Sequence, residues 1–140
     1  MKPVESLTLQ WMPGRLAVCR LPADVTPTDV GWAFGGTFTS WTRTPDEVSI
    51  VCDESSVPGE VRAERGWVAL RIAGTLDFGL VGILAELSGV LASAGVSLFA
   101  VSTFDTDYLL IRSVDSARAV GALRSAGHSV LEPEGPAGID

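Results

Sequence analysis

The second half of the chain carries the pattern that most constrains the fold, an apolar run with helical spacing between strand-like segments. Within residues 76–95, apolar side chains recur at every third or fourth position, which is the spacing of one helix face. Asp77 is a candidate N-cap for this helix, and Gly95 is a candidate stop. The apolar positions on the predicted face are Leu80, Ile83, Leu84, Leu87, Val90, Leu91 and Ala94.

The segments around this helix predict the rest of one folding unit. A second helix is predicted over 115–127, with Asp115 as its cap and Gly127 as its stop. The order of elements is then β-α-β-β-α-β. That order is satisfied by a ferredoxin-like unit, in which four strands form an antiparallel sheet and both helices cover one face. The four predicted strands are 67–74, 96–103, 108–113 and 128–133.

The first half of the chain predicts a weaker version of the same plan. Its elements are a strand at 15–21, a short helix at 26–34 that starts with Thr26 and Pro27, a hairpin of 37–44 and 47–54, and a loop or degraded helix at 55–66. Half of a 140-residue chain is marginal as an independent domain, so the halves are expected to share an interface. We therefore predict an α+β protein with two ferredoxin-like units side by side, the first of them degenerate. The predicted bounds are 1–62, 63–133 and a flexible tail at 134–140.

Composition excludes several classes of function. The formal net charge is −7 and the arginines are dispersed, which argues against electrostatic binding of nucleic acid. The N-terminal segment lacks the apolar core of a signal peptide, and no uninterrupted apolar run is long enough to span a membrane. We expect a cytoplasmic, globular protein with no membrane partner.

The residues that usually carry chemistry are sparse. Cys19 and Cys52 both lie in apolar strand-like contexts, so we expect two buried thiols, with a disulfide or a metal pair as the alternative. His128 is the only histidine and follows the glycine that ends a helix, which favours a structural or solvated role. These residues form no metal-ligand pattern and no nucleophile–base set. We expect no catalytic residues, no metal and no cofactor.

The stretch VSTFDTDYLLI at 101–111 contains two carboxylates in a hairpin corner. Turn chemistry explains Asp105, whereas Asp107 begins an apolar strand and needs a partner if it is buried. A site for a cationic group such as an amine is the other interpretation. Backbone N–H groups at the predicted helix start suit a carboxylate, and Gly79 and Gly82 there allow close approach. Together these features are compatible with a free amino acid, whose ammonium group would meet Asp107.

Three stretches carry a resemblance to a known family. Residues 76–111, LDFGLVGILAELSGVLASAGVSLFAVSTFDTDYLLI, together with DEVSIVCDE and ERGWVALRIAGTLDF, resemble ACT domains. More narrowly, they resemble small bacterial tandem-ACT proteins related to the CASTOR family of eukaryotic cytosolic arginine sensors. The resemblance implies that the chain binds a free amino acid at an interface between ACT units. It also implies that the chain regulates another protein and performs no chemistry.

The resemblance also implies a set of ligand-binding residues. They come from a strand, a helix-start loop and the hairpin corner: Val48, Ser49, Ile50, Asp77, Phe78, Gly79, Leu80, Thr103, Phe104 and Asp107. Leu80 stands where the arginine sensors carry a glutamate, so a neutral or apolar amino acid is as compatible as arginine.

The sequence therefore supports one hypothesis and two alternatives. The hypothesis is an amino-acid-binding regulatory protein, a homodimer that acts on a separate effector protein. One alternative is a structural or assembly module that keeps the fold without a ligand. The other is an enzyme that acts on a small amine or acid, and the sequence supports it least because no catalytic set of residues is present.

Overall fold

The computed structural model describes residues 6–73 and 82–132 of the chain. It divides into two compact units, and Gly14–Trp67 forms one of them. We call this the inserted unit, because the chain enters and leaves it between the two parts of the other. The split unit comprises the described residues before Gly14 and after Trp67. Strand β5 (Ala63–Ile72) contributes its first half to the inserted unit and its second half to the split unit.

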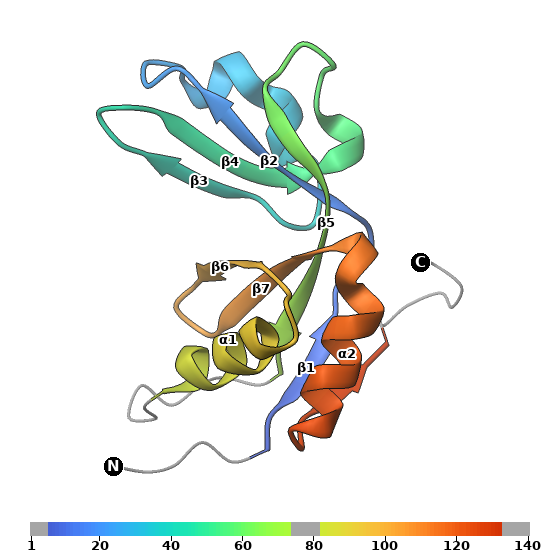
Figure 1. Cartoon of the computed structure of the whole chain (residues 1–140). Coiled ribbons are helices and arrows are strands. Elements are labelled where there is room, and N and C mark those ends of the chain that lie inside the picture. The colour runs from blue at the N-terminus through green and yellow to red at the C-terminus, as the bar shows by residue number, and fades with distance from the viewer. Residues whose placement is uncertain (1–5, 74–81, 133–140) are drawn as a thin grey trace. The chain divides into compact units, whose positions relative to one another are not determined.

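The split unit contains the predicted β-α-β-β-α-β order, which starts at β5 (Figure 1). Its sheet has the order β6-β7-β5-β1-β8. Besides the end of β5, its elements are β1 (Thr8–Trp11), α1 (Ile83–Ser93), β6 (Leu98–Ser102), β7 (Asp107–Arg112), the 3₁₀ turn η3 (Ser113–Asp115), α2 (Ser116–Ser125) and β8 (Ser129–Leu131).

Strand β1 was not predicted, and it lies inside this sheet, between β5 and β8. It pairs antiparallel with β5, where Leu9 faces Ile72, and parallel with β8, where Leu9 faces Val130. The N-terminal strand therefore separates the first and last strands of the predicted unit. As a result, the compact units do not follow the predicted bounds of 1–62 and 63–133, because β1 belongs with the later residues.

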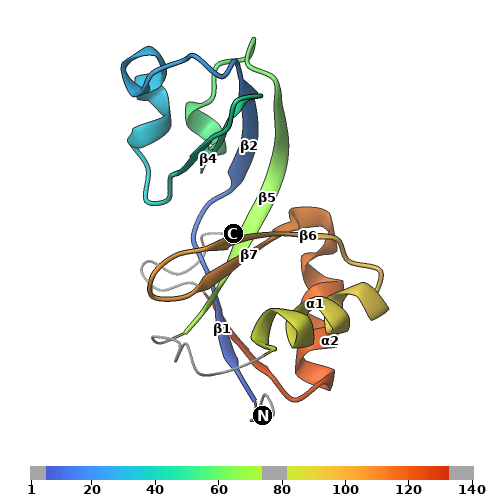
Figure 2. The ribbon, with the colours of Figure 1, turned by 90° about the vertical axis from the view of Figure 1, so that its left-hand side faces the viewer.

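The core of the split unit lies between its sheet and its two helices. Both helices cover the same face of the sheet (Figures 1 and 2). Leu87 and Leu91 of α1 and Leu123 of α2 are completely buried there, together with Leu109 of β7. Helix α1 ends as predicted at Gly95, whose φ of +76° suits glycine. The periodic apolar positions from Ile83 to Ala94 predicted this packing face correctly, and Leu80 lies outside the described residues. The helix begins later than predicted, at Ile83, with Gly82 rather than Asp77 at the N-cap position.

The inserted unit is an antiparallel sheet with the strand order β3-β4-β2-β5. Its core lies between β2, β4 and η1 and is made of smaller side chains such as Ala17, Val30 and Cys52. Besides the start of β5, its elements are β2 (Leu16–Leu21), the 3₁₀ helix η1 (Pro27–Phe34), β3 (Ser40–Arg43), β4 (Val48–Asp53) and the 3₁₀ turn η2 (Glu54–Ser56).

Two predictions for the inserted unit have different outcomes. The short helix is confirmed with Pro27 as its first residue, although it is 3₁₀ and is interrupted at Val30. The predicted loop at 55–66 is wrong in its last part, because β5 already begins at Ala63. Ala63 pairs with Cys19 of β2, and this long-range pairing leaves no local mark in the sequence. The α+β class with ferredoxin-like units is confirmed.

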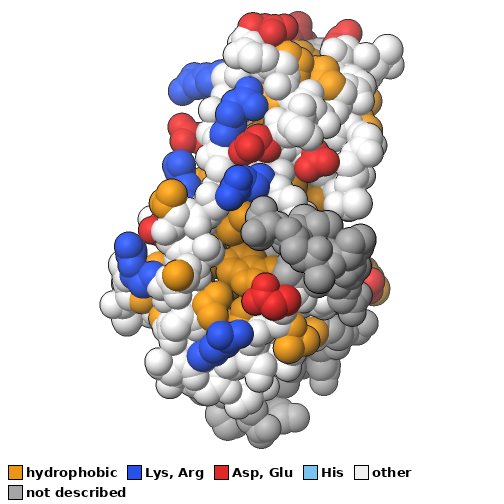
Figure 3. All heavy atoms as spheres, turned by 90° about the vertical axis from the view of Figure 1, so that its right-hand side faces the viewer, with side chains coloured by type: hydrophobic (Ala, Val, Ile, Leu, Met, Phe, Trp, Pro, Cys, Tyr) orange, Lys and Arg blue, Asp and Glu red, His pale blue; other side chains and the backbone are white. Residues whose placement is uncertain are grey.

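Two general properties of the chain bear on its partners. Figure 3 shows acidic and basic side chains interspersed on the face it presents, without a broad patch of one sign. Within residues 6–73 and 82–132, no helix has the length and apolar character needed to cross a bilayer.

Candidate functional site

The corner between β6 and β7 is closed by its two threonines. The backbone N–H of Thr103 donates to the Thr106 carbonyl at 2.8 Å, and the N–H of Thr106 donates to the Thr103 hydroxyl oxygen at 3.2 Å. Phe104 and Asp105 form the exposed tip, and Phe104 is 83% exposed. The Thr103 side chain, rather than a carboxylate, therefore provides the turn chemistry of this corner.

Thr106 also fastens the corner to the rest of the split unit. Its side chain is buried, and its hydroxyl donates to the carbonyl of Ile72 at 2.8 Å. Ile72 is the last residue of β5, so the corner lies against the chain just before residues 74–81. The predicted ligand residues Asp77, Phe78, Gly79 and Leu80 fall in that stretch, outside the described residues.

Asp107 occupies the first position of β7, directly opposite Ser102 of β6. Asp107 precedes the core residue Leu109 by two positions, and side chains two positions apart in a strand point to the same face. The Asp107 side chain therefore lies on the face of the sheet that the helices cover. The side chain is half-buried. Among the described residues, no hydrogen bond or ion pair engages its carboxylate. A half-buried carboxylate in this state can accept a charge-assisted hydrogen bond from an ammonium group.

The start of α1 is held by a buried histidine that the sequence predicted only as structural or solvated. The Nδ1 atom of His128 accepts the backbone N–H of Leu7 at 3.1 Å, and its Nε2 atom lies 3.0 Å from Glu86 Oε2. Because Nδ1 is an acceptor, the neutral ring carries its proton on Nε2 and donates it to Glu86. His128 thus joins β1, α1 and β8. The structural role is confirmed, whereas this set of partners had no signal in the sequence.

Gly82 precedes α1 with a φ of +84°, a conformation that favours glycine. The glycine at this position therefore has a conformational reason in addition to the close approach predicted from the sequence. Its carbonyl accepts the N–H of Glu86 at 2.8 Å, which begins the helical hydrogen bonding.

The predicted residues Val48, Ser49 and Ile50 lie on β4 of the inserted unit, whereas Thr103, Phe104 and Asp107 lie in the split unit. The side chains of Val48 and Ile50 are completely buried in the core of the inserted unit. Ser49 points to the opposite face of the sheet and is partly exposed. Of the three, Ser49 has the side chain that a ligand can reach.

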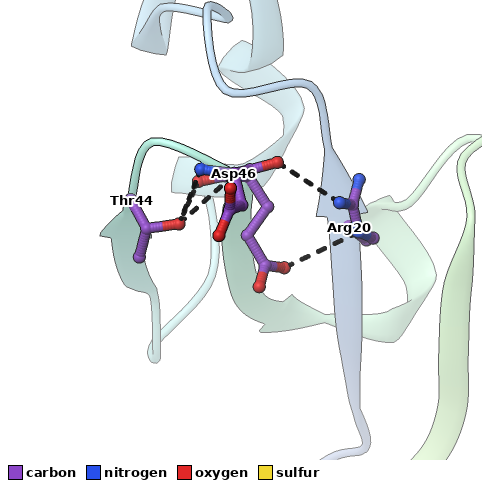
Figure 4. Close-up of polar contacts among 4 residues, drawn as sticks. Arg20, Thr44 and Asp46 are labelled. Carbon is purple, nitrogen blue, oxygen red and sulfur yellow. Dashed lines mark hydrogen bonds and ion pairs between the residues drawn. The ribbon is translucent and has the colours of Figure 1, made fainter.

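Ser49 lies between two polar neighbours on that face. Across the β2–β4 pair it faces Arg20, and across the β3–β4 pair it faces Thr42. Figure 4 shows the Arg20 guanidinium beside the turn that contains Thr44 and Asp46. Arg20 was not among the predicted site residues, because its position beside Ser49 depends on the register between β2 and β4.

The two cysteines are buried thiols, as predicted, and no disulfide joins them. A hydrogen bond to Cys19, together with burial, raises the pKa of the Cys52 thiol far above its ordinary value. A thiol of this kind stays protonated and is a poor nucleophile and metal ligand. Within residues 6–73 and 82–132, no three His, Cys, Asp or Glu side chains come together as a metal site would require.

Two protein-family models match the chain, each over a different range of residues. The family model described as ACT domain matches residues 62–125. A second family model, described as an N-terminal domain, matches residues 14–60. No curated protein matches the chain.

Solved structures provide further similarity. The protein Atu0741 from Agobacterium tumefaciens is 37% identical, with a TM-score of 0.87 over 94% of this chain and 97% of that one. VC0802 from Vibrio cholerae, a protein of unknown function described as a possible transport protein, is 17% identical, with a TM-score of 0.71 over 86% of this chain and 89% of that one. The regulatory subunit of aspartate kinase from Thermus thermophilus is 11% identical, with a TM-score of 0.59 over 89% of this chain and 99% of that one. The last two similarities concern the fold alone.

Proposed function

The chain belongs to the same family as Atu0741 of Agobacterium tumefaciens and contains an ACT domain, and we propose that it is a non-catalytic regulatory protein that binds a free amino acid. The observation that carries the proposal is the match of the ACT family model to residues 62–125. The fold similarity to a protein described as the regulatory subunit of aspartate kinase supports it.

The geometry of the split unit supplies a local argument for the same function. Asp107 offers a half-buried carboxylate without a protein partner among the described residues, which suits the ammonium group of an amino acid. The hydrogen bond from Thr106 to Ile72 holds the corner against the end of β5, which precedes the predicted loop at 77–80 in the sequence. In this proposal Asp107 binds the ammonium group, and the loop supplies backbone N–H groups to the carboxylate.

The proposal has three finer parts. The chain is related to the CASTOR family of arginine sensors, although Leu80 in place of a glutamate favours a neutral or apolar ligand as much as arginine. It acts as a homodimer on a separate effector protein. Ligand binding shifts the equilibrium between two arrangements of the ACT units. The size of this shift is limited by the difference between the affinities of the two arrangements for the ligand.

A thermal-shift screen against the twenty free amino acids tests the proposal. A ligand present at about 100 times its Kd adds about 2.7 kcal/mol to the unfolding free energy, which is readily measured as a rise in Tm. We expect a rise with one amino acid or with a chemically related few. No rise with any of the twenty would contradict amino-acid binding and favour the assembly module, in which the threonine-closed corner is only a turn.

Asp107→Asn tests the ammonium partner, with Asp105→Asn as the matched control at the exposed tip of the same corner. Asp107→Asn removes the negative charge and keeps the shape of the side chain, so we expect it to abolish the shift while unfolding stays cooperative. Asp105→Asn should bind like the wild type. Equal binding by both variants would exclude Asp107 as the partner of the ammonium group.

A further inference from the structure

One buried histidine ring holds two segments of the split unit that are distant in sequence. His128 directly precedes β8 and is 5% exposed. Its Nδ1 atom accepts the N–H of Leu7, just before β1, at 3.1 Å, and its Nε2 atom lies 3.0 Å from Oε2 of Glu86 on α1. Because an N–H group points at Nδ1, the neutral ring with its proton on Nε2 is the form that satisfies both contacts.

Protonation changes what this ring can do for each of its two partners. A proton on Nδ1 turns this acceptor into a donor, so two N–H groups would face each other across 3.1 Å and the bond to Leu7 is lost. The contact with Glu86 becomes an ion pair, and a charge-assisted hydrogen bond is stronger than a neutral one. The protonated ring is therefore held by α1 and no longer holds the chain before β1.

The hold on Leu7 is local to one end of β1. Among the described residues, the backbone of Leu7 makes two hydrogen bonds: its N–H donates to His128, and its carbonyl accepts the N–H of Ser129 at 2.9 Å. Further along, β1 pairs with β5 at Leu9 and Ile72, where His128 takes no part. Loss of the histidine bond therefore loosens the chain at Leu7 and leaves the rest of the strand paired.

Glu86 is the one charged side chain that contacts the ring among the described residues. It is the only charged residue of α1, and β1 and β8 carry none. Helix α2 carries Arg118 and Arg124, whose guanidinium groups donate to the carbonyls of Gly95 and Val130 at 3.3 and 2.8 Å. Histidine ordinarily changes its charge between about pH 5 and 8, a range in which glutamate ordinarily stays ionised. A change of pH within this range therefore acts on the ring.

We propose that His128 is a pH-sensitive latch, which fastens the chain at Leu7 while the ring is neutral and releases it when the ring is protonated. The latch consists of His128, Leu7 and Glu86. It lies within the split unit and needs no ligand, so this inference does not depend on the proposed function. It gives the start of β1 two states, one bonded to the ring and one free of it.

Amide hydrogen exchange of the full chain, followed by NMR at pH 8 and pH 5, tests the latch. The measured quantity is the protection factor of the Leu7 N–H, which is the intrinsic exchange rate at each pH divided by the observed rate. We expect it to fall at least about tenfold between pH 8 and pH 5. The N–H of Met12, which donates to the Ala69 carbonyl at the other end of β1, is the internal control and should keep its protection. Equal protection of Leu7 at both pH values overturns the proposal.

His128→Gln tests whether the ring itself causes the release. The glutamine side chain keeps one acceptor and one donor, as the neutral ring does, and it does not titrate. We expect the Leu7 protection factor of this variant to be the same at pH 8 and pH 5. A fall as large as that of the wild type would assign the release to another group and contradict the proposal.

Glu86→Gln tests the other partner without touching the ring or Leu7. The amide keeps an oxygen acceptor for Nε2 but carries no charge, so the protonated ring loses its ion-pair partner. We expect the pH midpoint of Leu7 release to move to lower pH. The Glu86 side chain is 38% exposed, so this variant should keep the fold even where His128→Gln does not.

Glu132→Gln is the matched control for Glu86→Gln. It removes an exposed carboxylate just after β8, and we expect it to leave the midpoint unchanged. A midpoint that is the same in Glu86→Gln and wild type would overturn the assignment of the release to protonation of His128.

Discussion

The split unit and the inserted unit share a strand–helix–strand–strand plan, but different elements cover their sheets. In the split unit, α1 and α2 have 11 and 10 residues and place large side chains such as Leu87 and Leu123 in the core. In the inserted unit the cover is η1, with 8 residues, and it buries only Val30 and Ala33. The sheet is thus covered by two α-helices in the split unit and by a 3₁₀ helix in the inserted unit.

The difference follows from local sequence. The segment that forms α1 repeats large apolar residues at helical spacing, so one face can pack continuously against the sheet. The segment that forms η1 has no such stripe, and its backbone leaves helical geometry at Val30, with φ −129° and ψ 43°. The core of the inserted unit therefore depends more on its strands, which contribute Val48, Ile50 and Cys52.

The largest effect is expected from a substitution that disrupts the packing of α1 against the sheet of the split unit. Leu87→Ala should lower the unfolding free energy by about 2–5 kcal/mol, because it leaves a cavity in a completely buried position. Val30→Ala, the equivalent change in the cover of the inserted unit, removes two carbons at about 0.8 kcal/mol each. Urea unfolding of the two variants measures both losses. A larger loss for Val30→Ala would mean that η1 is the more important cover.

A smaller effect is expected from the hairpin corners. Thr106→Val removes the hydroxyl that satisfies the Ile72 carbonyl inside the split unit, and a buried acceptor left unpaired costs about 1–3 kcal/mol. Thr44→Val at the corner of the inserted unit should cost less, because water can reach the N–H group of the exposed Asp46. The denaturant midpoints of the two variants test this ranking, provided that the slope of unfolding free energy against denaturant concentration is the same for both. Equal costs would show that the buried bond of Thr106 adds nothing to the turn.

The smallest effect concerns the start of η1. Asp29 accepts the N–H and hydroxyl of Thr26 at 2.9 and 3.0 Å, and these bonds hold the pKa of its carboxyl below the ordinary value. A carboxyl with a lowered folded-state pKa stabilises the fold above its unfolded-state pKa of about 3.9. That contribution disappears as pH falls through the folded-state pKa.

In thermal melts between pH 5 and about pH 2.5, the difference in Tm between wild type and Asp29→Asn should therefore narrow as the pH falls below the unfolded-state pKa and toward the folded-state pKa. We expect the variant to melt slightly earlier at the upper pH and to lose less stability on acidification. Parallel curves for the two proteins would show that the bonds from Thr26 contribute no pH-dependent stability.

For the candidate site, the sequence predicted individual residues and missed how some of them are grouped. The sequence placed Val48, Ser49 and Ile50 alike in the ligand set, and only the structure shows that Val48 and Ile50 are completely buried in the core. The half-burial of Asp107 depends on the sheet and helices packed around it, which no local pattern encodes. The placement of Arg20 beside Ser49 requires the register of two strands whose residues are distant in sequence.

The sequence by itself determined the parts of the fold whose signals are local. The helical face of α1, the end of that helix at Gly95, the β6–β7 hairpin and the start of η1 at Pro27 all follow from spacing, caps and turn residues within a few positions. Those signals act within one element and need no knowledge of its neighbours.

Only the tertiary structure decided how these elements combine. It placed β1 between β5 and β8, extended β5 back to Ala63, and brought Leu7, Glu86 and His128 into one hydrogen-bonded group. Each of these features depends on pairing between segments far apart in the chain. The free energy of such pairing comes from burial and backbone hydrogen bonds that form only when the whole sheet assembles, so a short strand such as β1 has no pattern of its own to reveal it.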